Sequence, residues 1–230
     1  MKILLTGGSG TLGRKLIELN KDIVAPSSKE VDVTDIDTLN SYVESVKPDV
    51  FVHSAAVVSY VECENNTSHA RNVNISGTVN VVNVCSEHNI KLIYISTDYA
   101  FDGKRGHYLP HDAVNPTNKY AKSKIAGELT VRTYDNSLVI RTSFFDGVLP
   151  YEFAATDAFT SKDDISLIGP MVYDAITSNK FGIIHVGTER KSIYDLAKSG
   201  NPNVKPIKRK DMGVSIPYDV SLRNIEYGEN

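Results

Sequence analysis

The sequence predicts an α/β fold in which helices cover both faces of a doubly wound parallel sheet. Short runs rich in valine, isoleucine and leucine alternate with stretches of helical pattern along most of the chain. These apolar runs are continuous, as is typical of parallel strands buried on both faces. A glycine cluster follows the first run directly. At 230 residues, the chain can bury one substantial core with a small appended lobe.

Strands and helices are expected to alternate, so that repeated strand–helix units build one doubly wound sheet. The predicted strands cover residues 2–6, 22–25, 49–53, 91–96, 137–141 and 182–186. The predicted helices cover residues 11–20, 36–45, 69–88 and 119–134.

The glycine cluster lies between the first strand and the first helix. Gly7, Gly10 and Gly13 are three residues apart, where a tight turn, a close backbone approach to a pyrophosphate and close helix–sheet packing each favour glycine. The N-terminus of the helix then offers free N–H groups and partial positive charge to the phosphates. The cluster therefore predicts a Rossmann-type dinucleotide site.

The tip of the second predicted strand bears on the choice of dinucleotide. In NAD-binding proteins an acidic residue there binds the ribose 2′-hydroxyl, but here the strand runs into Pro26 with no carboxylate at its tip. Ser27, Ser28, Lys29 and Arg14 could instead surround a 2′-phosphate. A polar turn and a helix-surface arginine are the alternative. NADP is therefore favoured modestly over NAD.

The pattern changes after Ser143. We expect a dinucleotide-binding domain over residues 1–143 and a mixed region over residues 144–230. Within that region, irregular segments at about 144–163 and 200–230 are expected to form a substrate lobe, because insertions at the carboxyl edge of such sheets complete the pocket. Residues at about 164–199 are expected to return to the main sheet.

Tyr120 and Lys124 are four residues apart on a predicted helix and so share one face. A cation beside the phenol favours the phenolate and is expected to lower the pKa of Tyr120 from about 10 towards the working pH. Thr97, with Ser96 as the alternative, stands at the carboxyl end of strand 91–96 and can hydrogen-bond the same substrate oxygen. The pattern predicts a proton donor for a developing alkoxide.

These motifs occur in the order seen in extended short-chain dehydrogenases/reductases, and in detail they resemble the dTDP-4-dehydrorhamnose reductase branch. The motifs that carry the resemblance are the glycine turn and residues 53–56 (His-Ser-Ala-Ala), 74–80 (Asn-Ile-Ser-Gly-Thr-Val-Asn), 96–103 (Ser-Thr-Asp-Tyr-Ala-Phe-Asp-Gly), 115–120 (Asn-Pro-Thr-Asn-Lys-Tyr), 141–143 (Arg-Thr-Ser) and 219–222 (Asp-Val-Ser-Leu). The resemblance covers residues 1–143 well and the remainder thinly. Members of the branch are typically longer.

The resemblance implies a cytoplasmic enzyme of rhamnose biosynthesis that reduces the 4-keto group of a nucleoside-diphosphate 6-deoxyhexulose, with Thr97, Tyr120 and Lys124 as its catalytic trio. It also implies cofactor contacts from Gly10, Thr11 and Leu12 at the pyrophosphate, Asp32 and Val33 at the adenine, and Ala55 and Ala56 along the cleft. Tyr99 and Asn74 would support the site, and Phe144 and Phe145 stand where the family places an aromatic pair. A capping role for Asp32 and plain packing for the two alanines are the alternatives.

Two further functions remain open at this stage. A combined 3,5-epimerase and 4-reductase would need extra acid/base groups, for which Cys63 is a weak candidate. A non-catalytic NADP-binding subunit, similar to the regulatory subunit of methionine adenosyltransferase, would account for the short substrate lobe.

The composition limits the kinds of molecule that the protein is expected to bind. A formal charge of -3 and one short basic run at residues 205–210 do not suggest a nucleic-acid partner. No signal-like or membrane-spanning apolar stretch is evident, no Cys or His spacing resembles a metal site, and two cysteines fit a reducing cytoplasm. The expected partner is a sugar-nucleotide substrate. The sequence leaves open whether the protein is a homodimer.

Overall fold

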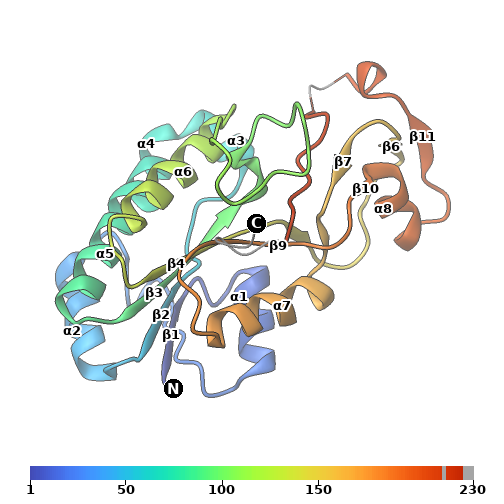
Figure 1. The fold of residues 1–230 in the computed structure, drawn as a ribbon. Coiled ribbons are helices and arrows are strands. Elements are labelled where there is room, and N and C mark those ends of the chain that lie inside the picture. The colour runs from blue at the N-terminus through green and yellow to red at the C-terminus, as the bar shows by residue number, and fades with distance from the viewer. Residues whose placement is uncertain (214–215, 225–230) are drawn as a thin grey trace.

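The computed structural model describes residues 1–213 and 216–224, and its centre is a five-stranded parallel sheet (Figure 1). The strand order is β1-β2-β3-β4-β9. In that order the strands are Ile3–Thr6, Val50–His53, Lys91–Thr97, Ser137–Thr142 and Gly182–Val186. The prediction of a doubly wound α/β fold is confirmed.

Helices cover both faces of the sheet (Figure 1). One face carries α1 (Thr11–Leu19) and α7 (Ile165–Thr177), and the other carries α2 (Ile36–Val46), α5 (Thr78–Glu87) and α6 (Lys119–Val131). Successive residues of β1 enter different cores: Ile3 and Leu5 pack on the α1 side, and Leu4 packs on the α2 side. This two-sided burial explains the continuous apolar runs.

The predicted strand at residues 22–25 is wrong, because only Val24 pairs, in an isolated bridge with Leu4. Its N–H donates to the Ile3 carbonyl at 2.9 Å and its carbonyl accepts from the Leu5 N–H at 2.8 Å. Pro26 follows almost at once and has no N–H with which to extend the pairing. Val24 and β2 therefore flank β1 on opposite sides, which makes β1 the point where the strand order reverses and where such sheets bind ligands.

The predicted helix over residues 69–88 is divided into several elements. These are the end of α4 (Thr67–Arg71), a π-helical turn (Asn72–Gly77) and α5. A further short helix, α3 (Tyr60–Asn65), precedes them and was not predicted. π-Helical turns within helices are frequent at functional sites.

The π-helical turn holds Asn74 inside the protein. Its Oδ1 accepts the Val57 N–H at 2.8 Å, and its Nδ2 donates to Ser123 Oγ at 2.9 Å. Asn74 is only 1% exposed. The side chain thus ties the loop after β2 to α6, which carries Tyr120.

Beyond β4 the chain builds a small lobe (Figure 1). Three pairs of short strands replace the irregular structure expected for residues 144–163: β5 (Phe144–Phe145) with β8 (Asp163–Asp164), β6 (Phe153–Ala155) with β11 (Lys205–Ile207), and β7 (Phe159–Thr160) with β10 (Lys191–Ser192). The helix α8 (Ile193–Gly200) packs against this lobe through Leu196 and Ala197, whereas α7 and β9 belong to the main sheet. Each strand is only two or three residues long, and most of them pair with strands that are distant in the chain. No local sequence pattern therefore predicts them.

Residues 217–224, which we call the tail strap, join the lobe to the loop after β3. Leu222 pairs with Tyr108, and Asp219 pairs with Phe159, each in an isolated bridge. The Asp219 carboxylate is buried and accepts from Arg190 Nε at 2.7 Å. The strap thereby fixes the lobe against the main domain. Within residues 1–213 and 216–224, no helix has the length and apolar character needed to cross a bilayer.

Candidate active site

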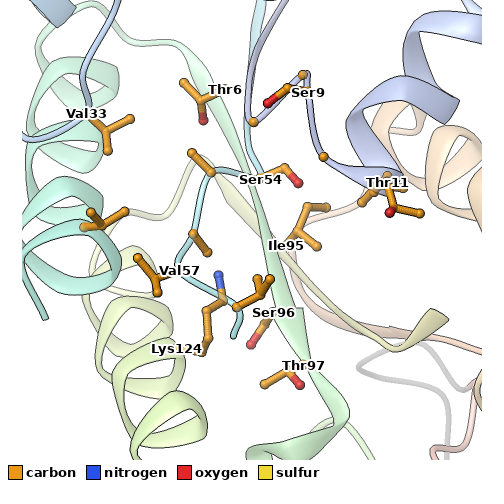
Figure 2. Close-up of a pocket in the computed structure, with 18 of the residues that line it drawn as sticks. Thr6, Ser9, Thr11, Val33, Ser54, Val57, Ile95, Ser96, Thr97 and Lys124 are labelled. Carbon is orange, nitrogen blue, oxygen red and sulfur yellow. The ribbon is translucent and has the colours of Figure 1, made fainter. Parts of the chain in front are cut away.

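A cavity of about 760 Å³ lies beside the carboxyl ends of β1, β2 and β3. It coincides with the point where the strand order reverses. Residues from the glycine turn, the loop after β2, the end of β3 and α6 line it, as Thr11, Ser54, Ser96 and Lys124 illustrate in Figure 2.

The glycine turn forms one end of the cavity, where Gly7, Gly10, Thr11 and Leu12 are lining residues. Gly7 has a φ of +81°, and a Cβ built on it would lie 2.7 Å from the Ala55 nitrogen. Helix α1 begins after Gly10 without a side-chain cap, so its first N–H groups stay available for an anion.

Gly13 lies behind the turn and is not a lining residue. A Cβ there would stand 2.2 Å from the Gly7 carbonyl oxygen. Its contribution is therefore the close packing of α1 on the turn.

The residues predicted to surround a 2′-phosphate divide into two groups. Ser27 and Ser28 line the cavity, whereas Lys29 and Arg14 do not. Arg14 donates to the Ser9 carbonyl at 2.6 Å and lies 3.6 Å from Asp146.

Glu30 is a carboxylate that the sequence analysis overlooked at this tip. Its Oε2 accepts the Ser27 hydroxyl at 2.7 Å and the Ser27 N–H at 2.8 Å, and these bonds lower the pKa of Glu30. A carboxylate therefore stands beside Ser27, although Glu30 itself does not line the cavity. Glu30 comes four residues after Pro26, and the turn between them brings its carboxylate back to Ser27.

Asp32 and Val33 line the cavity. The carboxylate of Asp32 accepts from Thr34, both from its N–H at 2.9 Å and from its hydroxyl at 2.8 Å, and the cap of α2 is Asp35 rather than Asp32. Ala55 and Ala56 also line the cavity, as expected for residues beside a bound dinucleotide.

Thr97, Tyr120 and Lys124 all line the same cavity. Thr97 is the last residue of β3, and its hydroxyl accepts the Tyr99 N–H at 3.2 Å. Tyr120 and Lys124 lie in the first turns of α6, which Asn118 caps by accepting the Ala121 N–H at 2.8 Å. The structure thus brings the three predicted catalytic side chains together, although their roles remain predictions.

Lys124 is the buried cation of the site. Its side chain points into the cavity in Figure 2, with the ammonium 4.1 Å from the centroid of the Tyr94 ring. Among the described residues it makes no hydrogen bond through this ammonium. Burial lowers the pKa of Lys124 to about 7, while the negative charge of Glu128 acts in the opposite direction.

The pKa of Tyr120 moves opposite to the expectation from sequence. Burial raises it to about 12, partly opposed by the Thr97 hydroxyl and reinforced by the charge of Asp98. The expected lowering by Lys124 is wrong for this arrangement, because removing the phenol from water outweighs its other interactions. Tyr120 is therefore fully protonated at neutral pH.

Ser96 also lines the cavity, but its hydroxyl is already engaged. It donates to Glu128 Oε2 at 2.7 Å, and Glu128 in turn accepts from Arg141 Nη2 at 2.6 Å. The Glu128 and Arg141 side chains are at most 1% exposed. Thr97 is therefore better placed than Ser96 to contact a substrate oxygen.

Of the remaining predicted residues, Tyr99 and Phe144 line the cavity, and Asn74 supports it from behind. Phe145 packs instead against the lobe core beside Leu149. Cys63 is fully buried and does not line the cavity, and burial raises the pKa of its thiol.

The sequence analysis missed four residues that line the cavity beside the catalytic trio: Asp98, Thr142, Ser143 and Lys162. Asp98 directly follows Thr97, so its position after β3 could have identified it. Thr142 and Ser143 end or follow β4 in the same way. Lys162 comes from the link between β7 and β8, and no local signal marks it.

The chain is similar to known proteins in sequence and in fold. The family described as RmlD substrate binding domain matches residues 1–164. The dTDP-4-dehydrorhamnose reductase of Aggregatibacter actinomycetemcomitans is 35% identical over 162 residues, which cover 67% of this chain and 55% of that protein. Methionine adenosyltransferase 2 subunit beta of Danio rerio is 33% identical over 158 residues, covering 64% of this chain and 48% of that protein.

The chain thus spans about half the length of these curated relatives. A solved dTDP-4-dehydrorhamnose reductase from Bacillus anthracis, in complex with NADP, is 26% identical, with a TM-score of 0.87 over 97% of this chain and 90% of that chain. The resemblance to extended short-chain dehydrogenases/reductases is confirmed. The chain belongs to the RmlD substrate binding domain family.

Proposed function

We propose that the protein is a reductase that uses NADPH to reduce the 4-keto group of a nucleoside-diphosphate 6-deoxyhexulose. The observation that carries the proposal is the convergence of Thr97, Tyr120 and Lys124 on the cavity that begins at the glycine turn. Similarity to reductases of such sugars supports the substrate class.

The described residues fit a dinucleotide. The uncapped N-terminus of α1 and the side-chain-free surface at Gly7 would hold the pyrophosphate, because a Cβ at Gly7 would clash with the backbone at Ala55. Lys124 offers an ammonium that lacks a hydrogen-bond partner among the described residues and would hold the nicotinamide ribose. NADPH supplies the hydride for the reduction.

Side chains of the protein would supply the proton for the reduction. Tyr120, with its pKa raised to about 12, is protonated at neutral pH and would give its proton to the carbonyl oxygen as negative charge develops there. Thr97 would donate a hydrogen bond to the same oxygen. The charge of Lys124, once protonated, would stabilise the phenolate that Tyr120 leaves.

A second cavity of about 280 Å³ gives the nucleotide part of the substrate a place to bind. Lobe residues such as Tyr151, Phe153 and Phe159 line it together with Pro217 of the tail strap. Aromatic and apolar surfaces of this kind suit a nucleobase. This proposal gives a substrate-binding role to the described residues of the lobe, which include β10 and α8 besides residues 144–163 and 200–213.

Cofactor preference gives a first testable result. We expect NADPH to bind more tightly than NADH by about 1 to 3 kcal/mol, the scale of a hydrogen bond to a charged group. Dissociation constants for both dinucleotides measure this preference. Equal affinities would remove Ser27 and Ser28 from the cofactor site.

Glu30 should moderate that preference, because its charge stands beside Ser27 and occupies the Ser27 hydroxyl as a donor. Glu30→Gln is therefore expected to tighten NADPH binding severalfold and to change NADH binding little. The exposed Asp37→Asn serves as a matched control on the neighbouring helix. An unchanged ratio of the two affinities would show that Glu30 does not face the 2′-phosphate.

The enzymatic proposal is tested by incubating the purified protein with NADPH and a panel of 4-keto-6-deoxy sugar nucleotides. Loss of NADPH absorbance with at least one of them is expected. Binding of NADPH without turnover of any sugar would favour a regulatory role such as that of the methionine adenosyltransferase subunit. Exchange of sugar ring protons with solvent would indicate the combined epimerase, for which the buried Cys63 offers no support.

We place the enzyme in the cytoplasm. Both cysteines, Cys63 and Cys85, are buried and unpaired, which suits a reducing compartment.

A further inference from the structure

Helix α6 carries a buried carboxylate one turn after the proposed catalytic lysine. Glu128 follows Lys124 by four residues, so the two side chains share one face of the helix. Both residues are buried, with Glu128 0% and Lys124 4% exposed. Ser96, which lines the cavity together with Lys124 (Figure 2), donates from its hydroxyl to Glu128 Oε2 at 2.7 Å. The carboxylate therefore lies one hydrogen bond behind the wall of the cavity.

The hydrogen bonds of Glu128 require an ionised carboxylate. Oε1 accepts from Arg141 Nη2 at 2.6 Å, and Oε2 accepts from Arg141 Nε at 3.1 Å as well as from Ser96. A guanidinium is always charged and can only donate, so donors occupy both carboxylate oxygens. Arg141 also donates from Nη1 to the Pro110 carbonyl at 3.1 Å. The negative charge of Glu128 is thus fixed in position.

The other titratable groups around Lys124 in the described residues give its ammonium no counter-charge. The ring nitrogens of His53, on β2, lie 2.8 and 3.1 Å from two threonine hydroxyls, and burial lowers the pKa of this histidine to about 3. Burial also raises the pKa of Tyr94, on β3, well above its usual value, and that of Tyr120 to about 12. The charge of Asp98 acts on Tyr120 instead.

Glu128 supplies the missing counter-charge. Its negative charge raises the pKa of Lys124, against the burial that lowers it to about 7. Arg141 does not cancel this effect, because its guanidinium comes from β4 whereas the carboxylate belongs to the same helix as Lys124. A lysine that is buried without a negative neighbour loses its proton below neutral pH.

We propose that Glu128 is a positioning residue that acts through Lys124, and that its fixed carboxylate keeps the buried ammonium charged at neutral pH. Ser96 and Arg141 hold the carboxylate in place and keep it ionised. The inference rests on the proposed function, because it concerns the cation that would hold the nicotinamide ribose and stabilise the phenolate of Tyr120. It adds to that function a residue that lies outside the cavity.

The charge on Lys124 can be followed by NMR titration of the lysine side-chain resonances of the protein without NADPH, with Lys124→Met to assign the signal. Glu128→Gln keeps the shape of the side chain and removes its charge. We expect this variant to lower the titration midpoint by about one pH unit or more, which is a tenfold or larger loss of proton affinity. Ser96→Ala, which keeps the buried charge, and Glu87→Gln, which removes an exposed charge on α5, should keep the wild-type midpoint.

The affinity for NADPH connects this titration to the site. The dissociation constant of Glu128→Gln should exceed that of the wild type by about three- to tenfold between pH 7 and 8, where the variant has lost more of the charge on Lys124. Near pH 5.5 the two proteins should bind almost equally, because Lys124 is protonated in both. An ion pair with a merely structural role would weaken binding to a similar extent at every pH.

The outcomes separate the two proposals. An unchanged titration midpoint in Glu128→Gln overturns this inference and leaves the proposed function standing. If that variant does not fold because Arg141 is left unpaired, Glu128→Gln combined with Arg141→Met removes both charges and should lower the midpoint in the same direction. An unchanged midpoint in the double variant is equally decisive against the inference. If the midpoint falls as expected but the wild type reduces no 4-keto sugar nucleotide, the proposed function fails, whereas the role of Glu128 towards Lys124 is upheld.

Discussion

Replacing Lys124 by methionine should raise the free energy of unfolding while abolishing turnover. Burial lowers the pKa of this lysine from 10.5 to about 7, so the folded protein holds its charge at a cost. Methionine keeps most of the aliphatic chain beside Tyr94 and removes the charge. Turnover and NADPH affinity should both fall, because the ammonium would hold the cofactor and stabilise the Tyr120 phenolate.

The stabilisation should depend on pH in a defined direction. Between about pH 7 and 10.5 the unfolded chain binds one more proton at this side chain than the folded protein does, so stability rises with pH in the wild type. Below pH 7 both states are charged and the cost is complete. At about 1.4 kcal/mol per pKa unit, the substitution should add roughly 3 to 5 kcal/mol near pH 6, and less as the pH rises.

Denaturant unfolding of the wild type and the variant at about pH 6 and pH 9, without NADPH, measures this difference. Lys122→Met, on the exposed side of the same helix, should change stability little at either pH. A Lys124→Met variant that is less stable than the wild type at pH 6 would contradict the expected cost of the buried charge.

Tyr120→Phe should reduce turnover at least about a hundredfold and leave NADPH affinity nearly unchanged. The ring packs in a small cluster with Val57 and Cys63, and phenylalanine preserves that packing. Only the hydroxyl is lost, and its raised pKa keeps it protonated at neutral pH, as the proposed proton donor must be.

Single-turnover reduction of a 4-keto sugar nucleotide, together with an NADPH binding curve, measures the two quantities separately. Tyr60→Phe, at an exposed tyrosine of α3, is the matched control and should behave as the wild type does. Retention of more than a few per cent of activity in Tyr120→Phe would assign the proton transfer to another group.

The parts of the fold and site that the sequence predicted are those in which neighbouring residues act together. The glycine turn needs only a strand, a tight turn and a helix in succession. Tyr120 and Lys124 share a face because of helix periodicity alone, and Thr97 is placed by the end of its strand. Most strands of the sheet were predicted from their continuous apolar runs, because a strand buried on both faces is one of the few structures that can bury such a run.

Features that depend on distant parts of the chain could not be predicted in the same way. Lys162 reaches the site only because β7 pairs with β10 and β5 with β8, and these strands are two residues long. Glu30 meets Ser27 through a turn whose side-chain directions no sequence pattern specifies. The pKa of Tyr120 rises because of burial, which is a property of the whole fold.

The tail strap also bears on how the protein reaches its native state. Its bond between the His107 N–H and Ser221 Oγ joins positions 114 residues apart. Closing so long a loop lowers the entropy of the chain before any stabilising contact has formed. Such non-local pairings therefore slow folding. The strand–helix units of the main sheet involve shorter loops and should assemble earlier. A newly made chain would then possess the glycine turn and the main-sheet side of the large cavity while the lobe is still forming.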